Sequence, residues 1–265
     1  MKHDFETVDF RREGKKLEVQ LRRPEVRNAF DARMIAELTS AFEEAAKDQE
    51  SSCVVVRGEG PVFCSGADVA WMRAAADYSE AENQADARRL SGLFQAFVAI
   101  PCPTIAVIQG AAVGGGSGLV ACADIAIAET GAKFGFTEVR LGIIPAAISP
   151  FVLRKVPPAH ARRYFSTGEV FDGRRAAEIG LVSEAVAADA LDRRVEEVVA
   201  EILAAGPVAA REAKRLVDRV VGQPMAEATE MTARLIAQVR ATDEAREGLS
   251  AFLEKRPPAW REEGP

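Results

Sequence analysis

The pattern of apolar and polar positions predicts several strands in the first half of the chain. Residues 16–22 (KLEVQLR) alternate apolar and polar side chains, which is typical of a strand with one buried face. Residues 53–57 (CVVVR) are almost uniformly apolar and rich in valine, which indicates a strand buried on both faces. Residues 104–109 (TIAVIQ) and 124–128 (DIAIA) have the same character and predict two further buried strands.

Helical periodicity separates these strands. Asp31 precedes apolar residues that recur at steps of three and four, so we expect it to cap a helix. Ser79 and Glu82 form a capping box at the start of a helix over about 79–99, and two prolines end that helix. Asp172 is expected to cap a further, shorter helix. Strand, helix and strand at this spacing predict an α/β class with a mostly parallel sheet.

No strand pattern survives after residue 187. Four amphipathic helices are predicted instead, at about 189–204, 207–221, 225–240 and 243–254. We therefore expect two parts: a core over 1–200 that contains the active site, and a helical region over 201–265. Because no flexible linker joins them, the helical region is expected to pack on the core or on a partner subunit.

Composition and charge exclude some classes of function. The 265 residues carry a net charge of −6, which argues against a nucleic-acid partner because a phosphate backbone favours a basic face. The N-terminus lacks the apolar segment of a signal peptide, and no apolar run reaches 18 residues, so we expect a cytoplasmic protein with no membrane partner. Four cysteines without CxxC spacing indicate free thiols, and two histidines argue against a His-rich metal site.

Three stretches carry candidate chemistry: residues 64–68 (CSGAD), 110–118 (GAAVGGGSG) and 134–145 (FGFTEVRLGIIP). The glycine run lies between a strand and a helix, where unpaired backbone N–H groups attract negative charge. The run matches no P-loop, dinucleotide-binding or nucleophile-elbow pattern, so a transient oxyanion remains as the candidate anion. A close helix–strand crossing that needs small residues is the structural alternative, and the run alone does not separate the two.

Taken together, residues 61–69, 110–122 and 134–145 resemble the crotonase (enoyl-CoA hydratase/isomerase) superfamily, and the resemblance extends over about 16–255. It implies a crotonase-type spiral core of repeated ββα units with a C-terminal helical trimerisation region. It also implies an acyl-CoA substrate, no cofactor other than the coenzyme A carried by that substrate, and assembly as a homotrimer or a dimer of trimers.

The resemblance assigns roles to particular residues. The backbone N–H groups of Ala67 and Gly115 match the two donors that hold a thioester oxygen, and Glu138 matches a glutamate that exchanges a proton with Cα. Hydratases of the superfamily usually carry a second glutamate, and here that position is Gly118. Three apolar neighbours in the sequence lead us to expect that burial raises the pKa of Glu138.

A single glutamate is the pattern of Δ3,Δ2-enoyl-CoA isomerases and of some hydratase branches. Residues 141–151 (LGIIPAAISPF), 67–73 (ADVAWMR) and 163–165 (RYF) resemble the bacterial methylglutaconyl-CoA hydratase branch, which acts in leucine metabolism. The expected reaction is therefore interconversion of 3-methylglutaconyl-CoA and 3-hydroxy-3-methylglutaryl-CoA. An isomerase, a general 2-enoyl-CoA hydratase, and a CoA-thioester binding protein with little turnover remain the alternatives.

Binding residues follow from the same resemblance and from the chemistry of the substrate. The expected acyl-group contacts are Arg73, Gly118, Ile143 and Pro145, with Arg73 the candidate for a distal carboxylate and Tyr78 or Asn83 as its alternatives. Arg73 as a solvated helix residue is an equally good interpretation. The expected coenzyme A contacts are Arg27, Ala29, Ser65, Asp68, Val69, Phe252 and Lys255, the last two reaching a neighbouring subunit.

Overall fold

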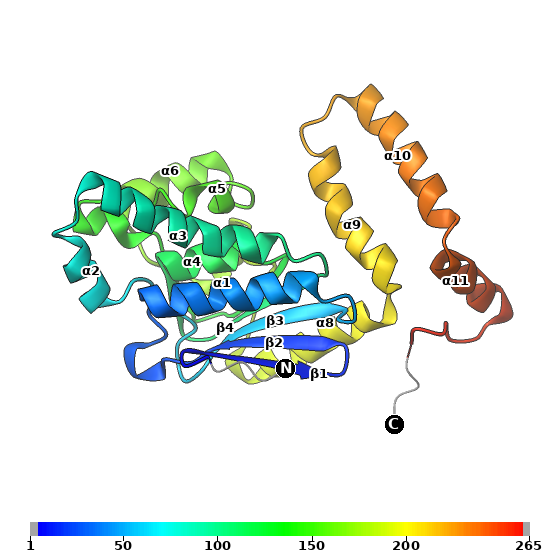
Figure 1. Ribbon diagram of the computed structural model, residues 1–265, viewed down its shortest axis with the longest axis horizontal. Helices are drawn as coiled ribbons and strands as arrows, with labels where there is room; N and C mark the ends of the chain where they lie inside the picture. The colour runs from blue at the N-terminus through cyan, green and yellow to red at the C-terminus, as the bar shows by residue number, and fades with distance from the viewer. Residues whose placement is uncertain (1–4, 262–265) are drawn as a thin grey trace.

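A computed structural model describes residues 5–261, and it places a large mixed sheet at the centre of an α/β core (Figure 1). Neighbouring strands follow the order β1-β2-β3-β4-β6-β9, with β1 antiparallel to β2 and every other pair parallel. The strands are Val8–Glu13 (β1), Lys16–Leu21 (β2), Cys53–Gly58 (β3), Thr104–Ile108 (β4), Ile125–Glu129 (β6) and Glu184–Val186 (β9). The predicted mostly parallel sheet is confirmed, although the sequence pattern did not reveal β1 or β9.

Both faces of the central strands are buried, as their apolar runs predicted. On one face, Val54 and Val56 of β3 pack beneath helices α1 (Ala32–Lys47) and α3 (Glu80–Val98). On the other face, Cys53 and Val55 pack against helix α8 (Leu191–Ala204). Strands of this kind have no solvated side, so their continuous hydrophobicity follows from the layers that cover them.

The caps that the sequence predicted are present. Asp31 accepts a hydrogen bond from the N–H of Met34 at the start of α1. Ser79 and Glu82 form the complete capping box of α3. The two helices then pack side by side, with the rings of Phe42 and Phe97 stacked at a centroid separation of 4.5 Å.

A second, three-stranded sheet has the order β5-β7-β8, from Ala111–Val113 (β5), Lys133–Gly135 (β7) and Phe171–Asp172 (β8). These strands are too short for a periodic pattern to predict. β4 and β5 follow one another but belong to different sheets, and helix α4 (Gly115–Cys122) comes next. β6 and β7 repeat this step before helices α5 (Ser149–Val152) and α6 (Pro158–Thr167). This repetition is the ββα spiral that was expected.

Shorter helical segments complete the core. They are α2 (Val69–Ala75), α7 (Gly173–Glu178) and the 3₁₀ turns η1 (Pro24–Val26), η2 (Thr137–Leu141) and η3 (Ala188–Ala190). Asp172 caps α7 through the N–H of Arg175, as predicted. All four cysteines are buried free thiols. Within the described part of the chain, no helix is long and apolar enough to cross a membrane.

The C-terminal helices are α9 (Pro207–Val220), α10 (Met225–Arg240) and α11 (Asp243–Glu254). Helix α9 is joined to the core through Lys214 and Arg211, and α10 and α11 lie beyond it (Figure 1). Residue 200, where we placed the boundary between the two parts, lies inside α8, and the division itself remains a prediction. Residues 1–4 and 262–265, at the ends of those parts, lie outside the described residues.

Candidate active site

A cavity of about 390 Å³ lies where the three predicted motifs meet, a size typical of small-molecule sites. Its walls come from the loop before α2, the first turn of α4, the segment from η2 to α5, and one face of α3. The lining residues are Phe30, Ser65, Gly66, Ala67, Trp71, Met72, Ala75, Asn83, Asp86, Ala87, Leu90, Val113, Gly114, Gly115, Thr137, Glu138, Leu141, Ile143, Ile144, Pro145, Ala146, Ala147 and Ile148. Motifs that are far apart in the sequence thus form one site.

The backbone N–H of Ala67 is free because of the way its loop pairs with Phe30. The N–H of Phe30 donates to the carbonyl of Gly66 at 2.7 Å, and the N–H of Asp68 donates to the carbonyl of Phe30 at 2.8 Å. In an extended segment, successive N–H groups point in opposite directions, so the N–H of Ala67 points away from Phe30. No acceptor for it occurs among residues 5–261.

The second free N–H is that of Gly115, the first residue of α4. Gly114 precedes it with φ of +52°, and the N–H of Gly114 donates to the carbonyl of Gly135 at 2.8 Å. The N–H of Gly115 has no acceptor in the described structure, as expected for the first turn of a helix. Ala67 and Gly115 therefore present two main-chain donors to one cavity, which is the arrangement of an oxyanion hole.

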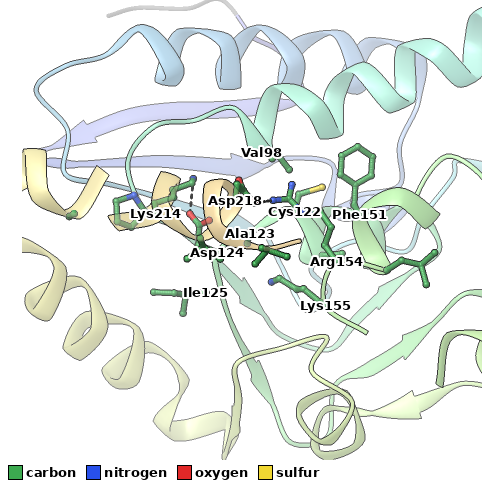
Figure 2. A pocket seen from close by; sticks show the side chains of 16 residues that line it. Val98, Cys122, Ala123, Asp124, Ile125, Phe151, Arg154, Lys155, Lys214 and Asp218 are labelled. Carbon is green, nitrogen blue, oxygen red and sulfur yellow. Dashed lines mark hydrogen bonds and ion pairs between the residues drawn. The ribbon is translucent and has the colours of Figure 1, made fainter. Parts of the chain in front are cut away.

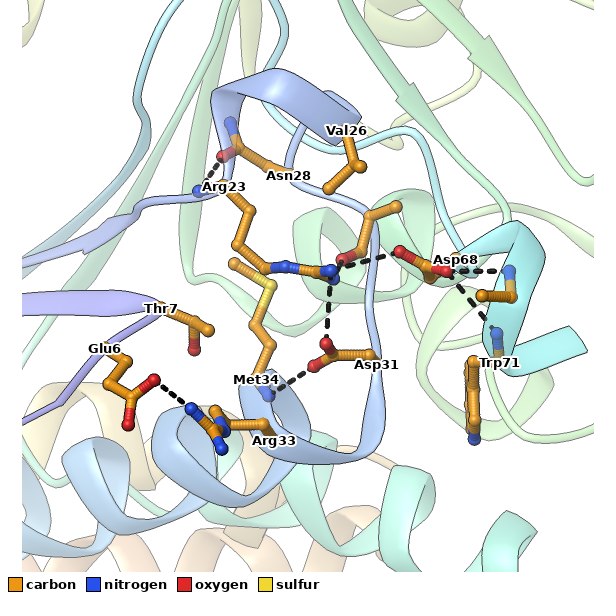
Figure 3. Close-up of polar contacts among 12 residues, drawn as sticks. Glu6, Thr7, Arg23, Val26, Asn28, Asp31, Arg33, Met34, Asp68 and Trp71 are labelled. Atoms are coloured by element: carbon orange, nitrogen blue, oxygen red, sulfur yellow. Dashed lines mark hydrogen bonds and ion pairs between the residues drawn. The ribbon is translucent and has the colours of Figure 1, made fainter. Parts of the chain in front are cut away.

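Arg23 fixes the loop that carries Ala67 (Figure 3). Its guanidinium donates to the carbonyl of Ala29 at 2.6 Å and to the carboxylate of Asp68 at 3.1 Å, and it pairs with Asp31 at 3.1 Å. Asp68 also caps α2. Although burial alone would raise the pKa of Asp68, hydrogen bonds to its carboxylate hold that pKa below its ordinary value. Its side chain is thus engaged in positioning the loop.

Glu138 faces the same cavity from the start of η2. Its Oε2 atom is buried and has no hydrogen-bond partner, one of two such side-chain atoms in the described residues. Burial raises the pKa of Glu138 above its ordinary value, and a hydrogen bond from its own N–H opposes the shift only in part. A Cβ on Gly114 would come within 3.4 Å of Oε1, so the carboxylate lies beside the turn that presents the N–H of Gly115.

Gly118, the position of the second glutamate in typical hydratases, is closed. A Cβ built there would lie 2.4 Å from Cγ2 of Ile148 and 3.0 Å from Cζ of Phe94. Both neighbours are buried, so a longer side chain at this position has no free path into the cavity. The packing around Gly118 therefore leaves no space for a carboxylate side chain, and Gly118 does not line the cavity.

The remaining predicted residues divide into two groups. Ser65, Ile143 and Pro145 line the cavity, and so does Asn83, the alternative to Arg73. Arg73 does not line the cavity and is exposed in the last turn of α2.

The predicted coenzyme A contacts lie in two different parts of the structure. Arg27, Ala29, Asp68 and Val69 belong to the two segments that border the oxyanion loop, outside the cavity itself. Phe252 and Lys255 lie at the end of α11, which is separated from α2 by the whole core and by α9 and α10 (Figure 1). Their contact with coenzyme A remains a prediction that requires a neighbouring subunit.

The sequence analysis missed several lining residues, chiefly on α3. Asp86, Ala87 and Leu90 line the cavity beside Asn83, which the sequence had suggested as an alternative to Arg73. Their spacing of three, four and seven residues places them on one face of the helix. The signal in the sequence was a carboxylate, that of Asp86, on the face of α3 that turns toward the cavity. Trp71 and Met72 on α2 also line the cavity, although the motif that contains them gave their side chains no role.

A larger hollow of about 740 Å³ lies between α9 and the core (Figure 2). Ala67, Gly115 and Glu138 do not line it. Lys214 of α9 pairs there with Asp124 at 2.7 Å. Burial lowers the pKa of Lys155 in the same hollow to about 8. Within residues 5–261, the larger hollow does not combine a pair of free main-chain donors with a buried carboxylate. The smaller cavity is therefore the candidate active site.

Comparisons with known proteins identify the family of the chain. Residues 12–263 match the family model described as enoyl-CoA hydratase/isomerase. A solved enoyl-CoA hydratase from Shewanella pealeana is 35% identical with a TM-score of 0.92, covering 97% of each chain. One from Mycobacterium smegmatis is 31% identical with a TM-score of 0.91, covering 96% of this chain and 99% of the other. The human mitochondrial enoyl-CoA hydratase domain-containing protein 2 is 34% identical over 249 residues, 92% of this chain and 84% of that protein. The chain therefore belongs to the enoyl-CoA hydratase/isomerase family of the crotonase superfamily.

Proposed function

We propose that this protein catalyses the reversible hydration of a 2-enoyl-CoA thioester. The N–H groups of Ala67 and Gly115 hold the thioester oxygen while charge develops on it, and Glu138 transfers a proton at Cα. One observation carries the proposal: the unpartnered Oε2 of Glu138 shares a cavity with two main-chain donors that lack acceptors among the described residues. Burial raises the pKa of the Glu138 carboxyl, which favours the protonated form that gives a proton to Cα.

Glu138→Gln tests this role because it removes the acid–base group and preserves the shape of the side chain. We expect the hydration rate constant to fall by roughly 100- to 10,000-fold, the range for loss of a general acid–base group. Binding of a saturated acyl-CoA, measured by calorimetry, should change by no more than a few fold. Hydration that survives the substitution would remove Glu138 from the mechanism.

For the acyl group we propose 3-methylglutaconyl-CoA, interconverted with 3-hydroxy-3-methylglutaryl-CoA. Support comes from the sequence of residues 141–151, which supplies the wall formed by Leu141, Ile143, Ile144 and Pro145. The amide of Asn83 lines the cavity and is a neutral donor suited to a distal carboxylate.

The charge of the cavity favours a second candidate, an enoyl-CoA with an apolar acyl group. Asp86 and Glu138 are the ionisable side chains that line the cavity, and no Lys, Arg or His accompanies them in the described residues. A distal carboxylate would be repelled by an ionised neighbour. Rates with 3-methylglutaconyl-CoA and with 3-methyl-2-pentenoyl-CoA, in which a methyl group replaces the distal carboxylate, decide between the two. A higher kcat/KM for the second compound would reject the dicarboxylic substrate.

Isomerisation of a 3-enoyl-CoA is the alternative reaction, favoured by the single glutamate and the closed position 118. It needs one base and no water, so a loss of the 3-enoyl substrate without formation of a hydroxy product identifies it. A protein that binds acyl-CoA and converts none of these compounds would instead be a binding protein.

We also propose that the chain assembles as a homotrimer or a dimer of trimers. Large apolar side chains are exposed on the C-terminal helices and at their ends, namely Val208, Val217, Val221, Met225, Ile236, Leu249, Phe252 and Leu253. Such a concentration of exposed apolar surface marks a contact surface. Light scattering should give three or six times the chain mass of 28.5 kDa, and a monomer would refute the proposal.

A further inference from the structure

Asp86 is a second carboxylate at the candidate active site, on the cavity-lining face of α3. It lies one turn from Asn83 and one turn from Leu90, and all three line the cavity. Its side chain is 14% exposed, in contrast to 61% for its helix neighbour Arg89. Asp86 is therefore a partly shielded carboxylate in the wall of the candidate active site.

A surface ion pair does not account for this placement. Oδ1 of Asp86 accepts from Arg89 at 3.1 Å, and Oδ2 has no partner among the described residues. A pair at this spacing on a helix stabilises by only about 0.2–0.5 kcal/mol. Such a pair forms equally well on a solvated face, so it gives no reason for the carboxylate to line a cavity.

Hydratases of the superfamily usually use a second carboxylate beside the glutamate that Glu138 matches. The reaction adds a proton to C2 and a hydroxyl to C3, so one group gives a proton while another takes a proton from water. In typical members of the superfamily that second group stands at the position of Gly118. Here Ile148 and Phe94 fill the space beside Gly118, so a second carboxylate at this site comes from another element.

We propose that Asp86 holds the water that adds to C3 and accepts its proton. This inference rests on the proposed hydration of a 2-enoyl thioester. The water oxygen bonds to C3 as its O–H bond breaks, and the proton passes to the carboxylate of Asp86. The electrons of the C2–C3 double bond move toward the thioester oxygen, which the N–H groups of Ala67 and Gly115 hold. The carboxyl group of Glu138 then gives its proton to C2, and proton exchange with solvent returns both carboxyl groups to their starting states.

Asp86→Asn tests the assignment, with two reactions measured on the same protein. The first is hydration of the 2-enoyl-CoA. The second is exchange of Cα hydrogen of a saturated acyl-CoA with D₂O, which needs the oxyanion hole and Glu138 but no added water. We expect hydration to fall at least about 100-fold and exchange to stay within a few fold. The matched control is Glu80→Gln, an exposed acid of the same helix outside the cavity, which should leave both rates unchanged.

The outcomes separate this proposal from the function on which it rests. If Asp86→Asn hydrates within a few fold of the unaltered protein, Asp86 does not activate water. If it loses hydration and exchange equally, Asp86 acts by maintaining the site, and the assignment is likewise wrong. Glu138→Gln should lose both reactions. If it keeps both, or if the unaltered protein catalyses neither, the proposed function itself fails, and the role of Asp86 fails with it.

Discussion

Gly118→Ala isolates the packing that closes the position of the usual second glutamate. The new methyl group would lie 2.4 Å from Cγ2 of Ile148, and under 3.0 Å one of the two groups must shift. Ile148 is β-branched and 2% exposed, so its side chain cannot rotate away cheaply. Phe94, at 3.0 Å from the same methyl group, is fully buried.

The magnitude follows from two opposing effects. Overpacking a well-packed core costs about 1–3 kcal/mol, and the crowding here favours the upper end. Replacing glycine by alanine in a helix returns about 1 kcal/mol. We expect a net loss of about 2 kcal/mol in the free energy of unfolding, which lowers Tm by about 4–8 °C in a chain of this size.

Gly92→Ala is the matched control, because Gly92 lies inside α3 and a Cβ there meets nothing within 4 Å. This variant keeps only the helical gain, so its Tm should rise slightly. Both melting curves are measured at equal protein concentration, since assembly shifts Tm. Equal Tm values for the two variants would refute the packing argument. Ile148→Ala offers a further check, because the methyl group introduced by Gly118→Ala should cost less when the isoleucine is absent.

Two further predictions concern the site. Since the folded-state pKa of Glu138 is raised, its ionisation lowers stability as pH rises above the ordinary value of 4.5. Glu138→Gln should therefore raise Tm at neutral pH, and the gain should vanish as pH falls below 4.5; an undiminished gain at low pH would contradict it. Asp68→Ala removes the cap of α2, which costs about 1–2 kcal/mol, and releases the oxyanion loop from Arg23. Its hydration rate should fall by less than the roughly 100-fold expected from complete loss of an oxyanion donor, whereas Asp77→Ala, an exposed change nearby, should have no effect.

The sequence predicted the large sheet and its helices well because each has a strong local signal. The apolar run at 53–57 and the capping box at Ser79 depend only on residues close together in the chain. β5, β7 and β8 are two or three residues long and exist because they pair with one another, which no local pattern reports. β1 is similar: its alternation is broken by charged residues, and its pairing with β2 determines it.

Site residues could be predicted where they belong to a sequence motif. They could not be predicted where only the fold brings them to the cavity. Glu138, Ala67 and Gly115 each lie in a stretch whose spacing is specific, and the structure brings them to one cavity. Arg73 was predicted from its charge and its proximity in sequence to the oxyanion loop, and it lies outside that cavity. Asp86 is distant in sequence from every motif, so its place in the cavity emerges only when α3 packs across α4.

The glycines of α4 connect these observations. Gly115 and Gly116 let the helix approach other segments closely, since a Cβ would lie 3.0 Å from the ring of Phe30 and 2.6 Å from the carbonyl of Cys64. Gly115 and Ala67 line the same cavity, so small residues in the first turn of α4 support the oxyanion hole that we propose. Gly118 extends the same close contact to Ile148. A helix packed this tightly along its first turn can present main-chain donors but no side-chain carboxylate. In the hydration that we propose, the second carboxylate therefore comes from another wall of the cavity, where α3 carries Asp86.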